Sequence, residues 1–127
     1  MSENWILADY EVALAQFEGA LAVPADSDLI KAGCIQYFEF CFELAWKSIK
    51  FVASSQGLPD CASPKACLKQ AFGAGWIEDE EVWLEMLEAR NRMSHTYNAR
   101  DALAIYERLG HFPPAFKGLL ARLREQI

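Results

Sequence analysis

The segment from Asp28 to about Gln56 constrains the fold most strongly, because its apolar residues cover two faces of one long predicted helix. Phe38, Cys41 or Phe42, Ala45, Ile49 and Val52 form one stripe, and Tyr37, Phe40, Leu44 and Phe51 form the other. Such a helix needs two packing partners, which a central place in a helical bundle or a dimer seam supplies. We therefore expect alanine at Phe42 or Trp46 to be among the most damaging core changes.

The rest of the chain predicts further helices and no strands. Helical periodicity runs over residues 4–22, 64–72, about 78–90, about 98–109 and 115–125. No alternating strand pattern, repeat or low-complexity tract is present. The sequence therefore predicts an all-α protein, and 127 residues are enough for a single domain spanning residues 1–127.

Turn signals mark the helix boundaries. Pro24 ends the first helix, and Asp26 or Ser27 can cap the second, which Gly57 suits as a stop. Ser63-Pro64 is typical of a helix start, since proline lacks the amide that would be unsatisfied there.

Two features of the first and last helices are also predicted. The segment from Gly110 to Pro114 must bend or interrupt the last helix, and both a kink and a loop are compatible with it. In the first helix, one stripe follows three- and four-residue steps and comprises Trp5, Ala8, Val12, Ala15 and Gly19.

Composition and charge narrow the possible functions. Hydrophobic residues make up 53% of the chain, which favours apolar surface reserved for a partner and makes a homodimer the default. The longest apolar stretch, residues 35–53, contains Glu39, Glu43 and Lys47 among its polar residues, too many for a membrane span. Residues 1–4 resemble no secretion signal, so a cytoplasmic location is expected.

Charge is distributed unevenly along the chain. A net charge of −6 argues against a general nucleic-acid coat, because phosphate affinity comes from clustered Lys and Arg. Residues 89–100 nevertheless hold three arginines, one histidine and no carboxylate, whereas residues 78–88 hold six acids and no base. We expect a local basic patch beside an acidic helix face.

The cysteines favour neither a metal site nor crosslinks. Cys34, Cys41, Cys61 and Cys67 contain no CxxC pair and no histidine at zinc-finger spacing. We predict buried thiols rather than disulfides, no bound metal and no cofactor.

One segment, residues 90–97, concentrates the polar chemistry of the chain near the end of a predicted helix. Arg90 can hold a phosphate with permanently charged donors, and His95 can move protons near neutral pH. Asn91, Ser94 and Tyr97 can orient a ligand. A phosphodiester or phosphoanhydride is the natural substrate for this set.

Each of these residues alone also has an ordinary structural interpretation. Arg90 or Arg92 can pair with Glu85, Glu88 or the negative end of its helix. A histidine such as His95 is often a capping or solvated residue, and a tyrosine often packs its ring at the edge of a core.

The pattern as a whole resembles the nucleotidyltransferase substrate-binding proteins of the HEPN superfamily, which includes HepT-type toxins paired with minimal nucleotidyltransferases. The resemblance is carried by residues 42–47, Ser63-Pro64-Lys65, residues 71–77, residues 83–87 and residues 90–97. Two departures are Lys65 in place of an expected arginine, and Asn98-Ala99 where an acidic pair is common.

The resemblance implies an antiparallel four- to five-helix up-and-down bundle that dimerises around a shared cleft. Active members of the superfamily cut RNA there without metal. By this resemblance, Arg90 would stabilise charge on the phosphorus centre and His95 would act as general acid or base at the ribose 2′-hydroxyl. Asn91 and Ser94 would position the substrate, and Tyr97 would be the hydroxyl that the partner enzyme modifies with AMP.

Helix geometry limits how the two predicted catalytic residues can meet. On a continuous helix Arg90 and His95 diverge by about 140°, whereas Arg90 and Tyr97 are about 20° apart. Either the helix ends near Met93, or Arg90 and His95 meet across a dimer axis.

Two functions are compatible with these observations. The leading hypothesis is a partner of a minimal nucleotidyltransferase that acts as a metal-independent ribonuclease toxin, silenced by AMP on Tyr97. The alternative is a non-catalytic subunit that presents a nucleotide or another substrate to the nucleotidyltransferase.

Overall fold

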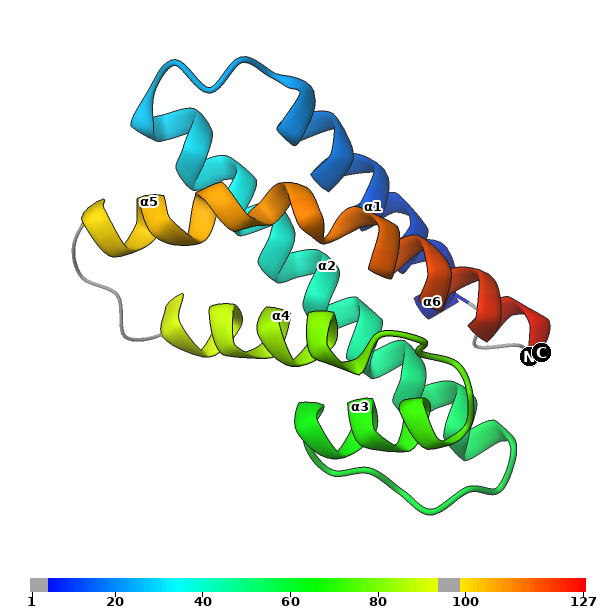
Figure 1. Cartoon of the computed structure of the whole chain (residues 1–127). Coiled ribbons are helices and arrows are strands. Elements are labelled where there is room, and N and C mark those ends of the chain that lie inside the picture. Colours follow the sequence, from blue (N-terminus) through cyan, green and yellow to red (C-terminus); the bar gives the residue numbers. More distant parts are fainter. Residues whose placement is uncertain (1–4, 94–98) are drawn as a thin grey trace.

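The computed structural model describes residues 5–93 and 99–127, and these form helices without any strand. Figure 1 shows α2 crossing the middle of the molecule, with the other helices packed around it. The elements are α1 (Trp5–Ala22), α2 (Asp28–Ser55), α3 (Pro64–Gly73), α4 (Glu80–Met93), α5 (Ala99–Arg108), the 3₁₀ turn η1 (Leu109–His111) and α6 (Pro113–Glu125). The all-α prediction is confirmed.

The predicted caps define the helix ends. The hydroxyl of Ser27 accepts a hydrogen bond from the Ile30 amide at 3.2 Å, and Ser63 accepts one from Ala66 at the same distance. At the other end of α2, Gly57 adopts a φ of 74°, a conformation that glycine reaches without steric cost.

The last helix is interrupted rather than merely kinked. The chain passes from α5 through η1 into α6, and Pro113 occupies the first position of α6, where its missing amide costs nothing. In Figure 1, α5 and α6 follow one another along nearly the same line. Both helices pack against α2, and α6 also packs against α1.

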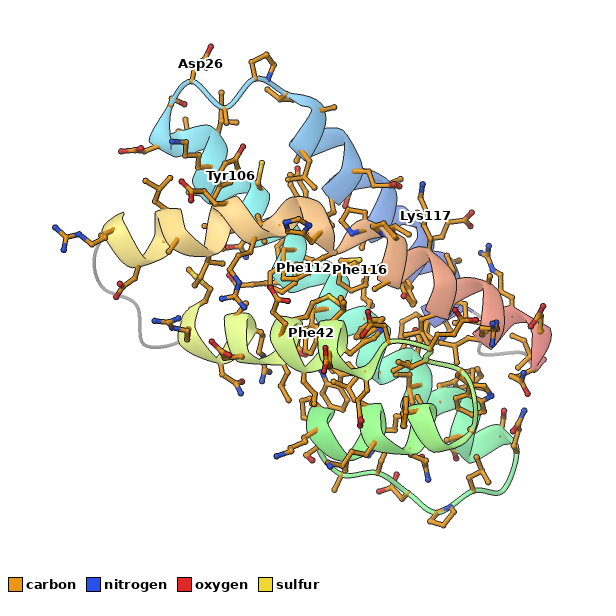
Figure 2. All side chains as sticks on the ribbon, in the orientation of Figure 1. Asp26, Phe42, Tyr106, Phe112, Phe116 and Lys117 are labelled. Atoms are coloured by element: carbon orange, nitrogen blue, oxygen red, sulfur yellow. A yellow bond between two sulfur atoms is a disulfide. The ribbon has the colours of Figure 1, made fainter. Side chains whose placement is uncertain are left out.

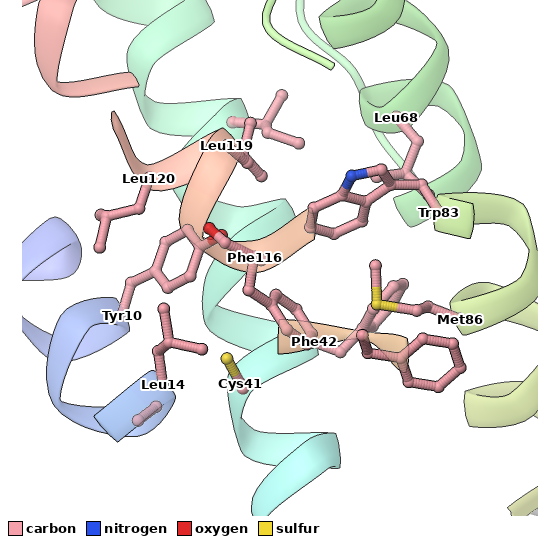
Figure 3. Close-up of a cluster of buried hydrophobic side chains, with 14 of the residues drawn as sticks. Tyr10, Leu14, Cys41, Phe42, Leu68, Trp83, Met86, Phe116, Leu119 and Leu120 are labelled. Atoms are coloured by element: carbon pink, nitrogen blue, oxygen red, sulfur yellow. The ribbon is translucent and has the colours of Figure 1, made fainter. Parts of the chain in front are cut away.

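The core is an aromatic cluster centred on α2. Phe38 and Phe42 are fully buried, and Phe38 packs against Phe112 with ring centroids 5.3 Å apart. Trp83 of α4 meets Phe116 of α6 edge to face at 5.3 Å (Figure 3). The first stripe predicted on α2 is therefore the core stripe, and α2 takes the central position.

One hydrogen bond fastens α1 to α6 inside this core. The hydroxyl of Tyr10 donates to the backbone carbonyl of Phe116 at 2.6 Å, and the Tyr10 side chain is fully buried. Burial raises the pKa of Tyr10 well above its ordinary value, so this hydroxyl remains a neutral donor.

Two core expectations are wrong. The stripe of α1 that contains Trp5 and Val12 faces solvent, with those side chains 58% and 56% exposed. The larger opposite face is buried instead, and it comprises Ile6, Leu7, Tyr10, Ala13, Leu14 and Phe17. Trp46 is only half-buried, because it lies beside the boundary of the core, where its indole N–H reaches Glu43.

The cysteine prediction holds for one pair and is wrong for the other. Cys34 and Cys41 are free, buried thiols, and burial raises the pKa of both. Cys61 and Cys67 form a disulfide, because the Ser63-Pro64 turn folds the linker back over α3 and brings their Cα atoms to 5.0 Å. The short distance between the Cys61 and Cys67 Cα atoms depends on this turn and not on helical spacing.

Phe42→Ala is expected to lower the free energy of unfolding by about 3–5 kcal/mol, because it opens a cavity in the aromatic cluster. Trp46→Ala should cost clearly less, since that ring is already partly exposed. Urea denaturation of both variants measures the difference. An equal loss for the two would contradict the placement of the core.

Candidate functional site

Arg90 lies in the last turn of α4 and reaches across to α2. Its Nη2 donates to Oε1 of Glu43 at 2.6 Å. The described part of α4 runs to Met93, and the two geometric possibilities predicted from the sequence concern residues that lie outside the described ones.

The carboxylate of Glu43 is held on both of its oxygens. Oε1 binds Arg90, and Oε2 accepts the indole N–H of Trp46. The Arg90 and Glu43 side chains remain 30% and 35% exposed. The guanidinium is thus fixed in direction by a charge-assisted bond while it stays accessible to a ligand.

Glu39 lies one turn before Glu43 on the same side of α2. Burial raises the pKa of Glu39, and the negative charge of Glu43 adds to that effect, whereas the positive charge of Arg90 opposes it. The guanidinium of Arg90 therefore interacts with two acids, with Glu43 through a hydrogen bond and with Glu39 through its charge.

Asn91, the next residue of α4, hydrogen-bonds to Arg90. Its Oδ1 accepts a hydrogen bond from Nη1 of Arg90 at 3.3 Å, and the residue is exposed. The structure thus brings together two of the predicted site residues, Arg90 and Asn91. The other three, Ser94, His95 and Tyr97, lie outside the described residues.

The ordinary pairing suggested by the sequence applies to Arg92 and not to Arg90. Arg92 lies 3.7 Å from Glu88 on its own helix, a contact that is exposed on both sides and worth little. Glu85 pairs with Arg108 of α5 at 3.1 Å. Arg90 instead pairs with Glu43 on a different helix, α2.

Sequence reasoning missed Glu39, Glu43 and Trp46 as parts of the site. A signal was present, because two acids four residues apart interrupt an otherwise apolar helix and share one face. Glu39 counted only against a membrane span, whereas Glu43 and Trp46 also belong to residues 42–47, which carry the family resemblance without an assigned role in the site. Which cation they face depends on how α4 crosses α2.

Neither a metal cluster nor a membrane span is found in the part of the chain that the structure describes. No group of three or more His, Cys, Asp or Glu residues there could hold a metal ion. No helix there is both long and apolar enough to cross a membrane.

The family model of nucleotidyltransferase substrate binding protein like proteins matches residues 6–125. This chain belongs to that family. The resemblance inferred from the sequence motifs is thereby confirmed, and the match extends from the second residue of α1 to the last residue of α6.

Similar proteins of known sequence or structure agree with this assignment. The chain is 33% identical over 103 residues to a Haemophilus influenzae protein named "Probable ribonuclease HepT", covering 78% of this chain and 70% of that protein. A crystal structure from Thermus thermophilus matches with a TM-score of 0.83 and 31% identity, over 91% of this chain and 98% of that one.

A second solved structure, also from Haemophilus influenzae, matches with a TM-score of 0.81 and 28% identity, over 93% of this chain and 98% of that one. It was described as the fold of a substrate-binding domain of a nucleotidyltransferase. The helical arrangement around Arg90 is therefore the fold of this family.

Glu39→Gln is expected to raise the thermal midpoint at pH 7. A raised folded-state pKa means that the folded protein binds a proton more readily than the unfolded chain, so the carboxylate destabilises the fold as pH rises above about 4.3. The gain should disappear near pH 3.5, where the group is protonated in both states.

Thermal melts of the parent and the variant at both pH values measure this effect. Glu107→Gln, at an exposed carboxylate of α5, is the matched control. A midpoint for Glu39→Gln at pH 7 that is equal to or lower than that of the parent would contradict the cause assigned to the shift.

Proposed function

We propose that this chain is the helical partner of a minimal nucleotidyltransferase and acts as a metal-independent ribonuclease that its partner silences. The observation that carries the proposal is the Arg90 guanidinium, held by Glu43 across two helices yet accessible, directly before the segment containing His95. The name of the HepT relative and the description of the solved nucleotidyltransferase domain support the two halves of the proposal.

The proposed reaction uses the ribose 2′-hydroxyl as nucleophile. His95 takes the proton from that hydroxyl, the 2′-oxygen bonds to phosphorus, and the bond to the 5′-oxygen breaks as that oxygen gains a proton. Arg90 stabilises the negative charge that builds on the phosphoryl oxygens. Asn91 and Ser94 position the substrate. The products are a 2′,3′-cyclic phosphate and a free 5′-hydroxyl.

A homodimer completes the proposed site. Two copies of the chain in one cleft would supply two histidines, one as general acid and the other as general base. A single histidine cannot be protonated and neutral at the same time. The apolar surface left on the protomer is consistent with such an assembly, since Phe40 is 47% exposed and Leu29 82% exposed on α2.

Removing either predicted catalytic side chain is expected to reduce RNA cleavage. His95→Ala should lower kcat by about 10²–10⁴, and Arg90→Ala by about 10²–10³. The rate of the parent should change between about pH 5 and 8, where a histidine titrates. Cleavage of a labelled RNA by purified protein without its partner measures both effects.

Arg124→Ala is the matched control, because Arg124 also pairs with a carboxylate, Glu11 at 2.6 Å, but lies on α6. Cleavage by an equally folded His95→Ala variant at the parental rate would rule out the nuclease. Stoichiometric binding to the nucleotidyltransferase, with nucleotide affinity that falls on Arg90→Ala and no RNA cleavage, would instead establish the non-catalytic binding subunit.

Co-expression with the proposed nucleotidyltransferase partner is expected to add AMP to Tyr97. In this step the phenolic oxygen attacks the α-phosphorus of ATP, pyrophosphate leaves, and RNA cleavage stops. Mass spectrometry of the peptide measures the modification. Tyr97→Phe should stay unmodified and active, whereas Tyr106→Phe, on α5, should be silenced like the parent. Modification of the Tyr97→Phe variant would refute the assignment.

A further inference from the structure

Most positive charge on this acidic chain is already neutralised within the described residues. Seven of the 12 Lys and Arg side chains form ion pairs with carboxylates there. Lys31 and Lys47 lie over the rings of Tyr106 and Trp46. Among the described residues, the basic side chains with neither kind of partner are Lys65, Lys69 and Arg100.

Two of these three cations line one cleft. Lys65 and Lys69 lie one turn apart on α3, and both are exposed. They face Leu84, Leu87 and Asn91 of α4 across a cleft of about 670 Å³. In Figure 1, α3 and α4 run in roughly opposite directions, so the start of α3 lies toward the later part of α4.

The cleft adjoins the proposed catalytic group. Asn91 lines it and also accepts the hydrogen bond from Nη1 of Arg90 at 3.3 Å. Asn91 therefore connects the cleft to the Arg90 guanidinium. Figure 2 shows the side chains of α3 and α4 around this region.

The residues of the cleft suit a phosphate backbone. Lysine ammonium groups bind phosphate oxygens, and Leu84 and Leu87 offer an apolar floor to sugar rings. Two carboxylates, Glu88 and Asp101, line the cleft together with three cations, Lys65, Lys69 and Arg92, so the lining is positive overall. The charge of Glu88 is offset by Arg92 at 3.7 Å and Arg108 at 4.0 Å. No aromatic ring is among the described lining residues, so base stacking is not provided.

We propose that this α3–α4 cleft binds the sugar–phosphate backbone of single-stranded RNA beside the scissile bond, with Lys65 and Lys69 each contacting a phosphate. The inference rests on the proposed ribonuclease function and names the path of its substrate. It implies that the cleft contributes affinity without sequence preference, since neither lysine would read a base edge. RNA is favoured over a protein partner because Asn91, which lines the cleft, also hydrogen-bonds to Arg90, the residue proposed to contact the scissile phosphate.

The test compares RNA binding by full-length variants made in a His95→Ala parent, so that cleavage cannot interfere. Fluorescence anisotropy gives Kd for two single-stranded oligonucleotides of unrelated sequence at several NaCl concentrations. Lys65→Gln with Lys69→Gln should weaken both equally and reduce the slope of log K against log salt by about 1.4, because two phosphate contacts are lost.

The matched control is Lys117→Gln with Arg124→Gln, which removes the same charge from α6, where both side chains pair with carboxylates of α1. It should change the slope by much less than the cleft variant does. Thermal melts establish that both double variants are folded.

Three outcomes would overturn the inference. A parent that binds no RNA would refute the proposed function and the cleft with it. A parent that binds RNA, with affinity and slope unchanged in the cleft variant, would refute the cleft alone. Intact RNA binding with lost binding to the nucleotidyltransferase would assign the cleft to the partner protein instead.

Discussion

Burial of α2 along most of its length is the constraint on which the rest of the structure depends. Its aromatic stripe is too large for one neighbouring helix to cover, so α1, α4, α5 and α6 pack around it. Burial of Phe38 and Phe42 stabilises the fold only when Phe112 and Trp83, from other parts of the chain, pack against them. The positions of α4 and α6 follow from that demand.

The candidate site is a consequence of the same packing. Once Trp83 holds α4 against α2, the last turn of α4 lies beside the polar positions of α2, and Arg90 meets Glu43. The pair remains partly exposed, so solvent screens it and its contribution to stability is small. Its larger effect is to fix where the guanidinium points.

Local signals account for the parts of the fold that were predicted correctly. Ser27, Ser63 and Gly57 act on their own helix ends, so neighbouring residues are enough to identify them. The order and spacing of the motifs from residues 42–47 to residues 90–97 together identified the family for the same reason, because they are properties of the chain. Errors arose where distant residues decided the outcome, as for the exposed stripe of α1 and the half-buried Trp46.

The sequence by itself determined the helices, their caps, the family, and Arg90 and Asn91 as candidate site residues, since periodicity and residue chemistry are local. Only the tertiary structure decided that Glu43 orients Arg90, that Cys61 lies against Cys67, and that Lys65 and Lys69 face α4. The physical reason is that periodicity reveals which residues share a face but not which surface that face meets. Helix packing settles that second question, through the areas buried by side chains far apart in the chain.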